Sequence, residues 1–318
     1  MCIFAQNLMT MEAIQDFAGL TSRLRSLERR IRVAVVCPND AHTEYVILRS
    51  LKEGFADFLL VADTPHLINA AYIHRQFPDH VKVYEASCPD KAAQEGVALV
   101  REGHADVLMK GIINTDNLLR AVLHKEYGLL PKGNILSHIT VAQIPLYNKL
   151  LFFSDAAVIP RPTLEQFDAM LRYDVEVCRC MGIDEPRVAL IHCTEKTNEK
   201  FPHTLDYVAL KERAEAGAYG RMYLDGPMDV KTACDSHSGE VKGINSPVAG
   251  HADMLIFPNI ESGNTFYKTV SLFGDANMAG MLLGTTAPVV VPSRADSGNS
   301  KFYSLVLACV CSEQTKQP

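Results

Sequence analysis

The sequence contains none of the short motifs that mark several common classes of enzyme. It has no GxGxxG fingerprint for dinucleotides, no GxSxG nucleophile elbow and no HExxH zinc site. Its nine cysteines form no CxxC pair, and the closest pairs, Cys178/Cys180 and Cys309/Cys311, have no CxxC or histidine pair to accompany them. This pattern indicates reduced thiols in the core rather than a disulfide framework or a metal site.

Long apolar runs and a strong charge bias are also absent. No run approaches the roughly 18 apolar residues that a membrane span requires. Residues 1–10 lack the basic start and the long apolar stretch of a signal peptide. The net charge is −6 and the pI is about 6.0, which argues against nucleic acid or a membrane surface as the main partner. We therefore expect a cytoplasmic protein that binds neither nucleic acids nor membranes.

Short apolar runs alternate with helical stretches along most of the chain, and 47% of the 318 residues are hydrophobic, which is enough for a large core. The runs are Val33–Val36, Phe58–Val61, Val81–Tyr84, Val107–Met109, Leu150–Phe153, Val188–Ile191, Met254–Phe257, Met281–Leu283 and Val289–Val291. Helical periods lie between them, for example at Ala92–Arg101, Asn117–His124 and Leu164–Met181. Such an alternation predicts an α/β fold whose mostly parallel sheets are covered by helices on both faces.

Two proline-containing stretches are candidate linkers in an otherwise repeat-free chain. IPRPT lies at 159–163, and GTTAP at 284–288 marks the point where the chain is expected to cross back. We predict two α/β/α domains with a cleft between them. The first comprises residues 1–150 plus 284–318, and the second comprises 151–283.

The strongest anion-binding signal follows the last apolar run. Ligands of such sheets bind beyond the carboxyl ends of the strands, where loops lead into helices. Ser293 and Arg294 stand at such a strand end, and Asp296 or Ser297 is a suitable N-cap for the next helix. A guanidinium group beside a helix N-terminus suits phosphate, because both donate hydrogen bonds to an anion.

Other loops add weaker candidates. Glycine in PNIESGN (258–264) lets the backbone approach a ligand closely. A lysine that directly follows a strand, as in MKG (109–111), could steady a phosphate as a point charge, although the segment is not a Walker P-loop. The candidate substrate-binding residues are Lys110, Gly111, Ser137, Glu261, Ser262, Gly263, Asn264 and Ser297.

Two further motifs allow more than one interpretation. His138 lies in an apolar neighbourhood, where a histidine is more often a hydrogen-bonded core residue than a catalyst. Asp225 and Asp229 stand four residues apart, a spacing that could place two carboxylates on one helix face to hold Mg²⁺. The Gly226-Pro227 pair instead favours a turn that opens a helix with Asp225 as its cap.

In their order and spacing, these segments resemble the phosphate acetyltransferase and phosphate butyryltransferase family. The resemblance runs from about Val81 to the C-terminus, and the LMKG, LDGP and SRADS forms are similar to the butyryl branch. Ser293 and Arg294 match the acetyl branch residue by residue. That branch has an acidic residue several positions later, whereas the corresponding position in this sequence, at about Ser300, is not acidic. The matching segments include ADVLMKG (105–111), NLLRAVLHKEYGL (117–129), LSH (136–138), SDAAV (154–158), EPRVALIHCTEKTNEKFPHTLD (185–206), LDGPMDVKTACD (224–235), KGINSPVAGHADMLIFPNIESGN (242–264) and SRADS (293–297).

The resemblance implies a fold like that of isocitrate and isopropylmalate dehydrogenases, an active site in the cleft, and a homodimer. It implies reversible transfer of a short acyl group between coenzyme A and phosphate, with no cofactor beyond coenzyme A as a substrate. In the resulting hypothesis Arg294, with Lys110, binds phosphate, and Ser293 donates a hydrogen bond to the oxyanion. Asp296 or His138 accepts the thiol proton.

Two other functions stay open at this point. A metal- and NAD-dependent dehydrogenase of the same architecture would use Asp225, Asp229 and Asp253 for its metal. A non-catalytic acyl-CoA-binding domain would keep the fold with a degenerate site. The SRADS and ESGN loops favour the acyltransferase. The form of the motifs favours butyryl over acetyl. The sequence gives no second argument on chain length, because one methylene group in an apolar pocket changes the binding free energy by only about 1–3 kcal/mol.

Overall fold

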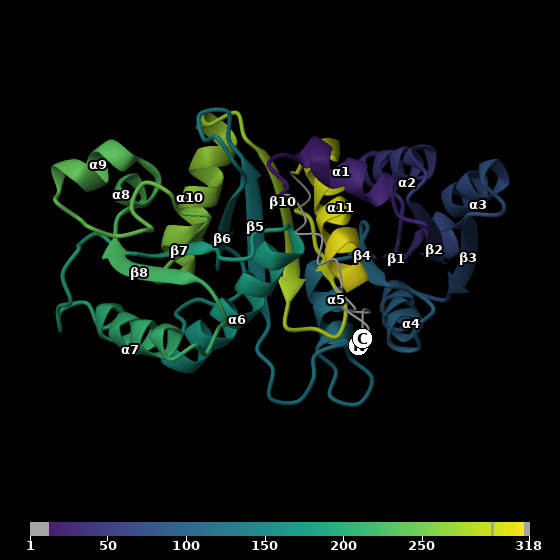
Figure 1. The fold of residues 1–318 in the computed structure, drawn as a ribbon. Helices are drawn as coiled ribbons and strands as arrows, with labels where there is room; N and C mark the ends of the chain where they lie inside the picture. Colours follow the sequence, from purple (N-terminus) through teal and green to yellow (C-terminus); the bar gives the residue numbers. More distant parts are fainter. Residues whose placement is uncertain (1–12, 294–295, 315–318) are drawn as a thin grey trace, which may run out of the picture.

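The computed structural model describes residues 13–293 and 296–314, without the side chains of His66 and Gln314. In this part of the chain the strands form a single 11-stranded sheet in the order β3-β2-β1-β4-β11-β10-β5-β6-β9-β7-β8 (Figure 1). The strands are β1 (Ile31–Val36), β2 (Ala56–Asp63), β3 (Val81–Ala86), β4 (Val107–Lys110), β5 (Ser137–Gln143), β6 (Leu151–Ser154), β7 (Arg187–Ile191), β8 (Tyr223–Met228), β9 (Met254–Ile256), β10 (Asn277–Leu283) and β11 (Val289–Val290). The helices are α1 (Phe17–Arg25), α2 (Ala41–Glu53), the 3-10 turn η1 (Thr64–His66), α3 (Leu67–Gln76), α4 (Pro89–Arg101), α5 (Thr115–Val122), α6 (Leu164–Cys180), α7 (His203–Glu215), α8 (Val230–Cys234), α9 (Ser236–Val241), α10 (Ile260–Phe273) and α11 (Gly298–Gln314).

The sheet is parallel at both ends and antiparallel in the middle. At one end β3, β2, β1, β4 and β11 pair in parallel, and at the other end β6, β9, β7 and β8 do the same. Between them β5 runs antiparallel to β10 and β6, and β10 runs antiparallel to β11. The predicted α/β fold with a mostly parallel sheet is confirmed. The domain boundaries at 150/151 and 283/284 stay a prediction, and the sheet crosses both of them without a break.

The hydrophobic core differs between the two faces of the sheet. On one face a continuous cluster extends across the molecule, from Val33 and Val35 on β1 through Ile139 on β5 to Val188 on β7. On the other face the core is divided into one cluster under α4 and α5 and a second one around β6, β9 and α10. This division leaves the other face of β5 and β10 free of a continuous core.

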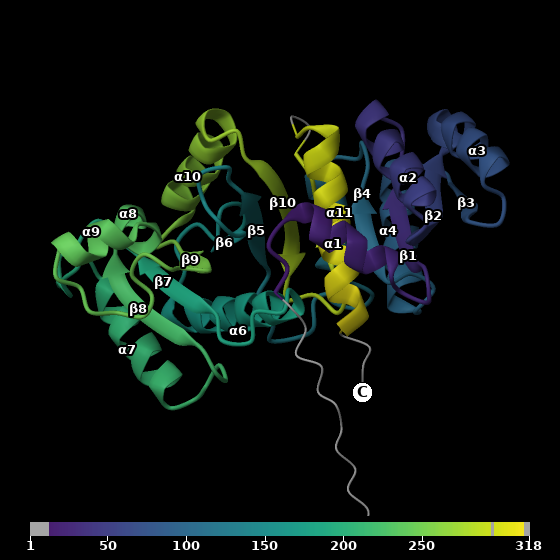
Figure 2. The same cartoon turned by 45° about the horizontal axis from the view of Figure 1, so that its top comes forward.

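Helices α10 and α11 stand on either side of this central pair of strands (Figure 2). Helix α10 begins at an N-cap, Asn259, whose side chain accepts a hydrogen bond from the Ser262 N–H at 2.9 Å. At the start of α11 the Ser297 hydroxyl group accepts from the Ser300 N–H at 3.1 Å, as predicted for a capping residue there. Helix α11 also bonds to the sheet directly, because the Gly280 N–H donates to Ser304 Oγ at 3.0 Å.

The prediction that Asp225 caps a helix is wrong. Asp225, Gly226 and Pro227 lie inside β8, and it is Asp229 that caps α8 by accepting from the Thr232 N–H at 2.7 Å. The physical reason is that β8 is the outermost strand of the sheet. An edge strand tolerates proline, because no partner strand needs the missing N–H group.

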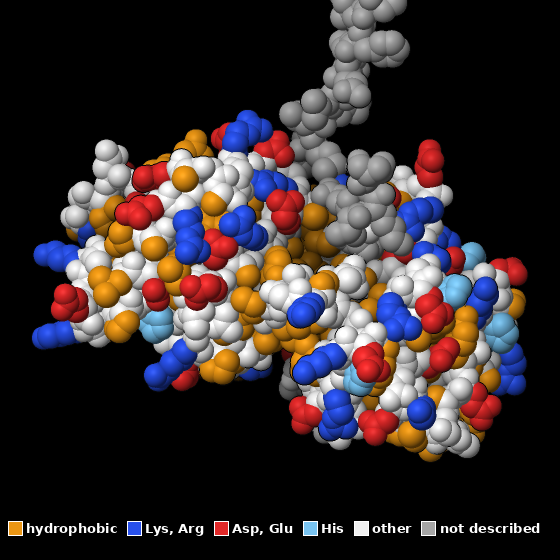
Figure 3. Space-filling view, turned by 90° about the horizontal axis from the view of Figure 1, so that it is seen from below, with side chains coloured by type: hydrophobic (Ala, Val, Ile, Leu, Met, Phe, Trp, Pro, Cys, Tyr) orange, Lys and Arg blue, Asp and Glu red, His pale blue; other side chains and the backbone are white. Residues whose placement is uncertain are grey.

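Charged side chains of both signs are interspersed over the face seen in Figure 3, and hydrophobic side chains gather in the depression between the two halves of the molecule. Within the described residues, no helix has the length and apolar character to cross a membrane. The cysteines in the same residues form no disulfide with one another.

Candidate functional site

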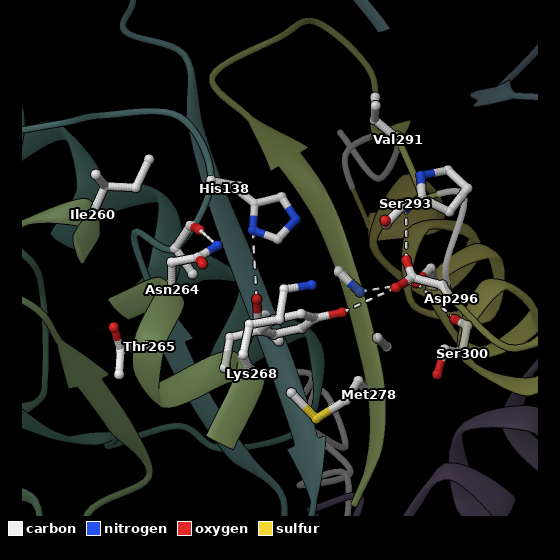
Figure 4. Close-up of a pocket in the computed structure, with 18 of the residues that line it drawn as sticks. His138, Ile260, Asn264, Thr265, Lys268, Met278, Val291, Ser293, Asp296 and Ser300 are labelled. Carbon is white, nitrogen blue, oxygen red and sulfur yellow. Dashed lines mark hydrogen bonds between the residues drawn. The ribbon is translucent and has the colours of Figure 1, made fainter. Parts of the chain in front are cut away.

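A cavity of about 650 Å³ lies over the central strands β5 and β10. Its walls are α10 on one side and residues 291–293 and 296–304 on the other (Figure 4). The segments after β6, β9 and β11 all contribute, so the cavity lies at carboxyl ends of strands, where ligands of α/β sheets bind. It is lined by His138, Thr140, Ala156, Ala157, Ile260, Glu261, Asn264, Thr265, Tyr267, Lys268, Met278, Ala279, Gly280, Val291, Pro292, Ser293, Asp296, Ser300 and Ser304.

His138 lies on the floor of this cavity. Residues alternate between the two faces of a strand, so His138 and Thr140 face the cavity while Ile139 between them packs into the core. The His138 Nδ1 atom lies 3.5 Å from the Thr140 hydroxyl oxygen. A Cβ atom on Gly280, which pairs with Thr140 across β10 and β5, would lie 2.9 Å from His138 Cε1 and Nε2. The absence of a side chain at Gly280 therefore makes room for the imidazole ring.

The surroundings of His138 favour a neutral ring. Burial lowers its pKa from the ordinary value, because an imidazolium loses hydration there. The negative charges of Asp155 and Asp296 oppose this effect in part. Asp155 also fixes the strand, because its Oδ2 atom accepts from the His138 N–H at 3.1 Å. A neutral imidazole has a nitrogen atom that can accept a proton, so the ring can act as a base.

Ser293 and Asp296 form a closed turn on the opposite wall. The Asp296 Oδ2 atom accepts from the Ser293 N–H at 2.7 Å, and the Asp296 N–H donates to the Ser293 carbonyl oxygen at 3.2 Å. The Asp296 Oδ1 atom accepts from the hydroxyl group of Tyr267 at 3.2 Å. Arg294, which the sequence analysis assigns to phosphate, lies outside the described residues.

One face of α10 lines the cavity with four polar residues, of which only two were predicted from the sequence. Glu261, Asn264, Thr265 and Lys268 recur at the helical spacing of three and four, and all of them line the cavity. The first two were predicted, and this spacing alone points to the other two. Lys268 is the one lysine or arginine among the described residues that line the cavity. Its Nζ atom lies 4.5 Å from the ring centroid of Tyr267.

Lys110 and Gly111, both predicted to bind substrate, do not line this cavity. Lys110 is buried at the end of β4, where its Nζ donates to the Gly111 carbonyl oxygen at 3.1 Å. A Cβ atom on Gly111 would lie 2.1 Å from the Cys37 carbonyl oxygen. The glycine thus serves close backbone packing in this structure, and the ligand role of both residues stays a prediction.

Four other predicted residues lie near the cavity without lining it. Ser137 faces the core on β5, and its buried hydroxyl group has no hydrogen-bond partner among the described residues. Ser262 Oγ donates to the Asn259 carbonyl oxygen, and Ser297 caps α11. A Cβ atom on Gly263 would lie 2.3 Å from the Asp155 carbonyl oxygen, so this glycine lets α10 pack against the segment after β6.

The carboxylates that a metal-dependent dehydrogenase would need do not converge. Within residues 13–293 and 296–314, no three His, Cys, Asp or Glu side chains come together as metal ligands. Each carboxylate is paired with a different lysine: Asp225 with Lys211, Asp229 with Lys242, and Asp253 with Lys149.

Several known proteins are similar to this chain over most of its length. Residues 72–309 match the model of the phosphate acetyl/butaryl transferase family. The phosphate butyryltransferase of Clostridium acetobutylicum is 35% identical over 297 residues, which cover 93% of this chain and 98% of that protein. The phosphate acetyltransferase of Thermotoga maritima is 34% identical over 280 residues, which cover 88% of this chain and 94% of that protein.

A solved structure gives the same result. The crystal structure of a branched-chain phosphotransacylase from Enterococcus faecalis superposes with a TM-score of 0.77 at 31% identity, over 89% of this chain and 99% of that one. These matches confirm the resemblance that the sequence motifs indicate. The chain belongs to the phosphate acetyl/butaryl transferase family and is a phosphate acyltransferase.

Proposed function

We propose that the protein transfers a short acyl group, butyryl in preference to acetyl, between coenzyme A and inorganic phosphate. Acyl-CoA and phosphate give acyl phosphate and free coenzyme A, with no metal or nucleotide cofactor. The observation that carries the proposal is the convergence of His138, Ser293 and the polar face of α10 on a single cavity. Such a cavity can hold both substrates together, so that no enzyme nucleophile is needed.

The phosphate end of the site is the Ser293–Asp296 turn. In the forward direction a phosphate oxygen attacks the thioester carbonyl carbon, the C–S bond breaks, and its electron pair leaves with the coenzyme A sulfur. Ser293 would donate a hydrogen bond to the oxyanion, and Arg294 would hold the phosphate. Lys268 adds positive charge to the same cavity.

The proton is best assigned to His138. In the reverse direction the coenzyme A thiol gives its proton to the ring, the thiolate attacks the acyl phosphate carbonyl carbon, and phosphate leaves. Free thiols, imidazoles and aspartates have pKa values of about 8.5, 6.5 and 3.9, so imidazole is the closer match to a thiol. Both oxygens of Asp296 already accept hydrogen bonds from the protein, which favours a structural role for that carboxylate.

The preference for butyryl rests on the apolar part of the cavity. Ala156 and Ala157 leave room beside the side chains of Ile260 and Met278, and this surface suits an alkyl chain. We also propose that the protein works in the cytoplasm as a homo-oligomer, in line with its resemblance to the family.

The test is phosphate-dependent release of free coenzyme A, measured with a thiol reagent on butyryl-CoA and acetyl-CoA in parallel. Release that saturates with phosphate and is faster for butyryl-CoA supports the proposal. Tight binding of both esters without release would instead identify a non-catalytic acyl-CoA-binding protein. Faster release from acetyl-CoA would keep the reaction and overturn the assigned chain length.

A further inference from the structure

A hydrogen bond joins the two walls of the cavity. The hydroxyl group of Tyr267, on α10, donates to Asp296 Oδ1, on the wall that leads into α11, at 3.2 Å (Figure 4). These two residues are 29 positions apart, and β10 and β11 lie between them in the sequence. The bond therefore connects two elements that pack on opposite sides of the central strands.

The Asp296 carboxylate transmits this contact to the turn that carries Ser293. Its other oxygen, Oδ2, accepts from the Ser293 N–H at 2.7 Å. The two oxygens belong to one rigid planar group, so a fixed Oδ1 also fixes Oδ2 and the Ser293 backbone. In the sequence, Arg294 stands between these two residues.

Tyr267 is held in a position suited to this bond. Its ring packs against buried Phe153 at a centroid distance of 6.5 Å, and the Lys268 amine lies over the ring. Burial, with the negative charge of Asp296, raises the pKa of Tyr267 above its ordinary value. The hydroxyl group thus keeps its proton and stays a donor throughout the neutral pH range.

We infer that Tyr267 is a positioning residue for acyl transfer, and that its hydroxyl group fastens the Ser293–Asp296 turn to α10 across the cavity. This inference rests on the proposed function, because the turn is the assigned phosphate end of the site. Without the hydroxyl group the turn can occupy other positions, and phosphate binding must supply the free energy to select the competent one.

The test is the Tyr267→Phe variant, which keeps the ring and its packing. A hydrogen bond to a charged group contributes enough to change an equilibrium by roughly tenfold or more. The KM for phosphate should therefore rise about tenfold, while the KM for acyl-CoA should change by less than about twofold. Tyr147→Phe is the matched control. The Tyr147 hydroxyl group donates a hydrogen bond of 2.6 Å to the Ala252 carbonyl oxygen, and neither residue lines the cavity. This variant should leave both KM values unchanged.

A double-mutant cycle with Asp296→Ala separates this role from a direct contact with substrate. If Tyr267 acts through Asp296, the Tyr267→Phe change should alter the phosphate KM by less than about twofold in the Asp296→Ala background. An undiminished effect in that background, or unchanged phosphate KM in the single variant, overturns the inference. If the wild-type protein itself releases no coenzyme A with phosphate, the proposed function fails and the inference falls with it.

Discussion

Replacing Gly280 with alanine is expected to displace the His138 ring and to slow turnover about a hundredfold. The added Cβ atom would lie 2.9 Å from two ring atoms of His138 and 3.1 Å from the Ile139 carbonyl oxygen. Carbon atoms in ordinary contact are about 3.5–4.0 Å apart, so the ring must move by about 0.6–1 Å. It can move toward the open cavity, which preserves the fold. A displacement of about 1 Å at a reacting group costs on the order of a hundredfold in rate.

The assay is release of coenzyme A from butyryl-CoA at saturating phosphate, with thermal unfolding measured on the same samples. Gly239→Ala is the control, because its added Cβ atom meets only the Ala249 Cβ atom, at 3.2 Å. The loss should also disappear in a His138→Ala background, where no ring remains to be moved. A folded Gly280→Ala protein with wild-type turnover would refute the assignment of His138 to the reaction.

Three further predictions concern charge and shape. Asp174 is buried, and burial raises its pKa well above the ordinary value of about 4. The folded protein therefore binds a proton at Asp174 that the unfolded chain releases above about pH 4. The free energy of unfolding falls as the pH rises from there toward the folded-state pKa. In denaturant titrations the stability of Asp174→Asn relative to wild type should therefore grow as the pH rises above about 4, by up to about 1.4 kcal/mol per pH unit. Asp296→Asn removes a negative charge that raises the pKa of His138. The acid limb of the pH profile of kcat/KM, measured with acyl phosphate and coenzyme A, should therefore move to lower pH. A shift to higher pH would contradict this. Met278→Phe should reduce the ratio of butyryl-CoA to acetyl-CoA turnover by roughly tenfold or more if the alkyl chain occupies that part of the cavity, and an unchanged ratio would place the chain elsewhere.

The overall fold follows from the sequence because buried parallel strands have a simple signature. Runs such as Val33–Val36 and Val188–Ile191 are apolar on both faces, and helices with a clear period separate them. β5 was not predicted, although it forms the floor of the site. Its sequence, SHITVAQ, contains no continuous apolar run, because polar residues that face the cavity alternate with the β-branched residues Ile139 and Val141, which face the core.

The site was predicted only in part, because a sequence motif does not distinguish packing from binding. Ser293, Asp296, Asn264 and His138 do line one cavity. Gly263, in a segment that also resembles the family, is required by backbone packing at the start of α10. Tyr267 carries no motif at all, and its importance depends on a contact with a residue 29 positions away, which only the folded chain brings about.

We propose that the acyl group is transferred in the cavity between α10 and the start of α11. The most direct test is a crystal structure with butyryl-CoA bound. The thioester carbonyl group is expected between His138 and Ser293, with the butyryl chain against Met278. A thioester bound elsewhere, for example in the hollow beyond β7 and β8 that is lined by Ile191 and Val230, would contradict it.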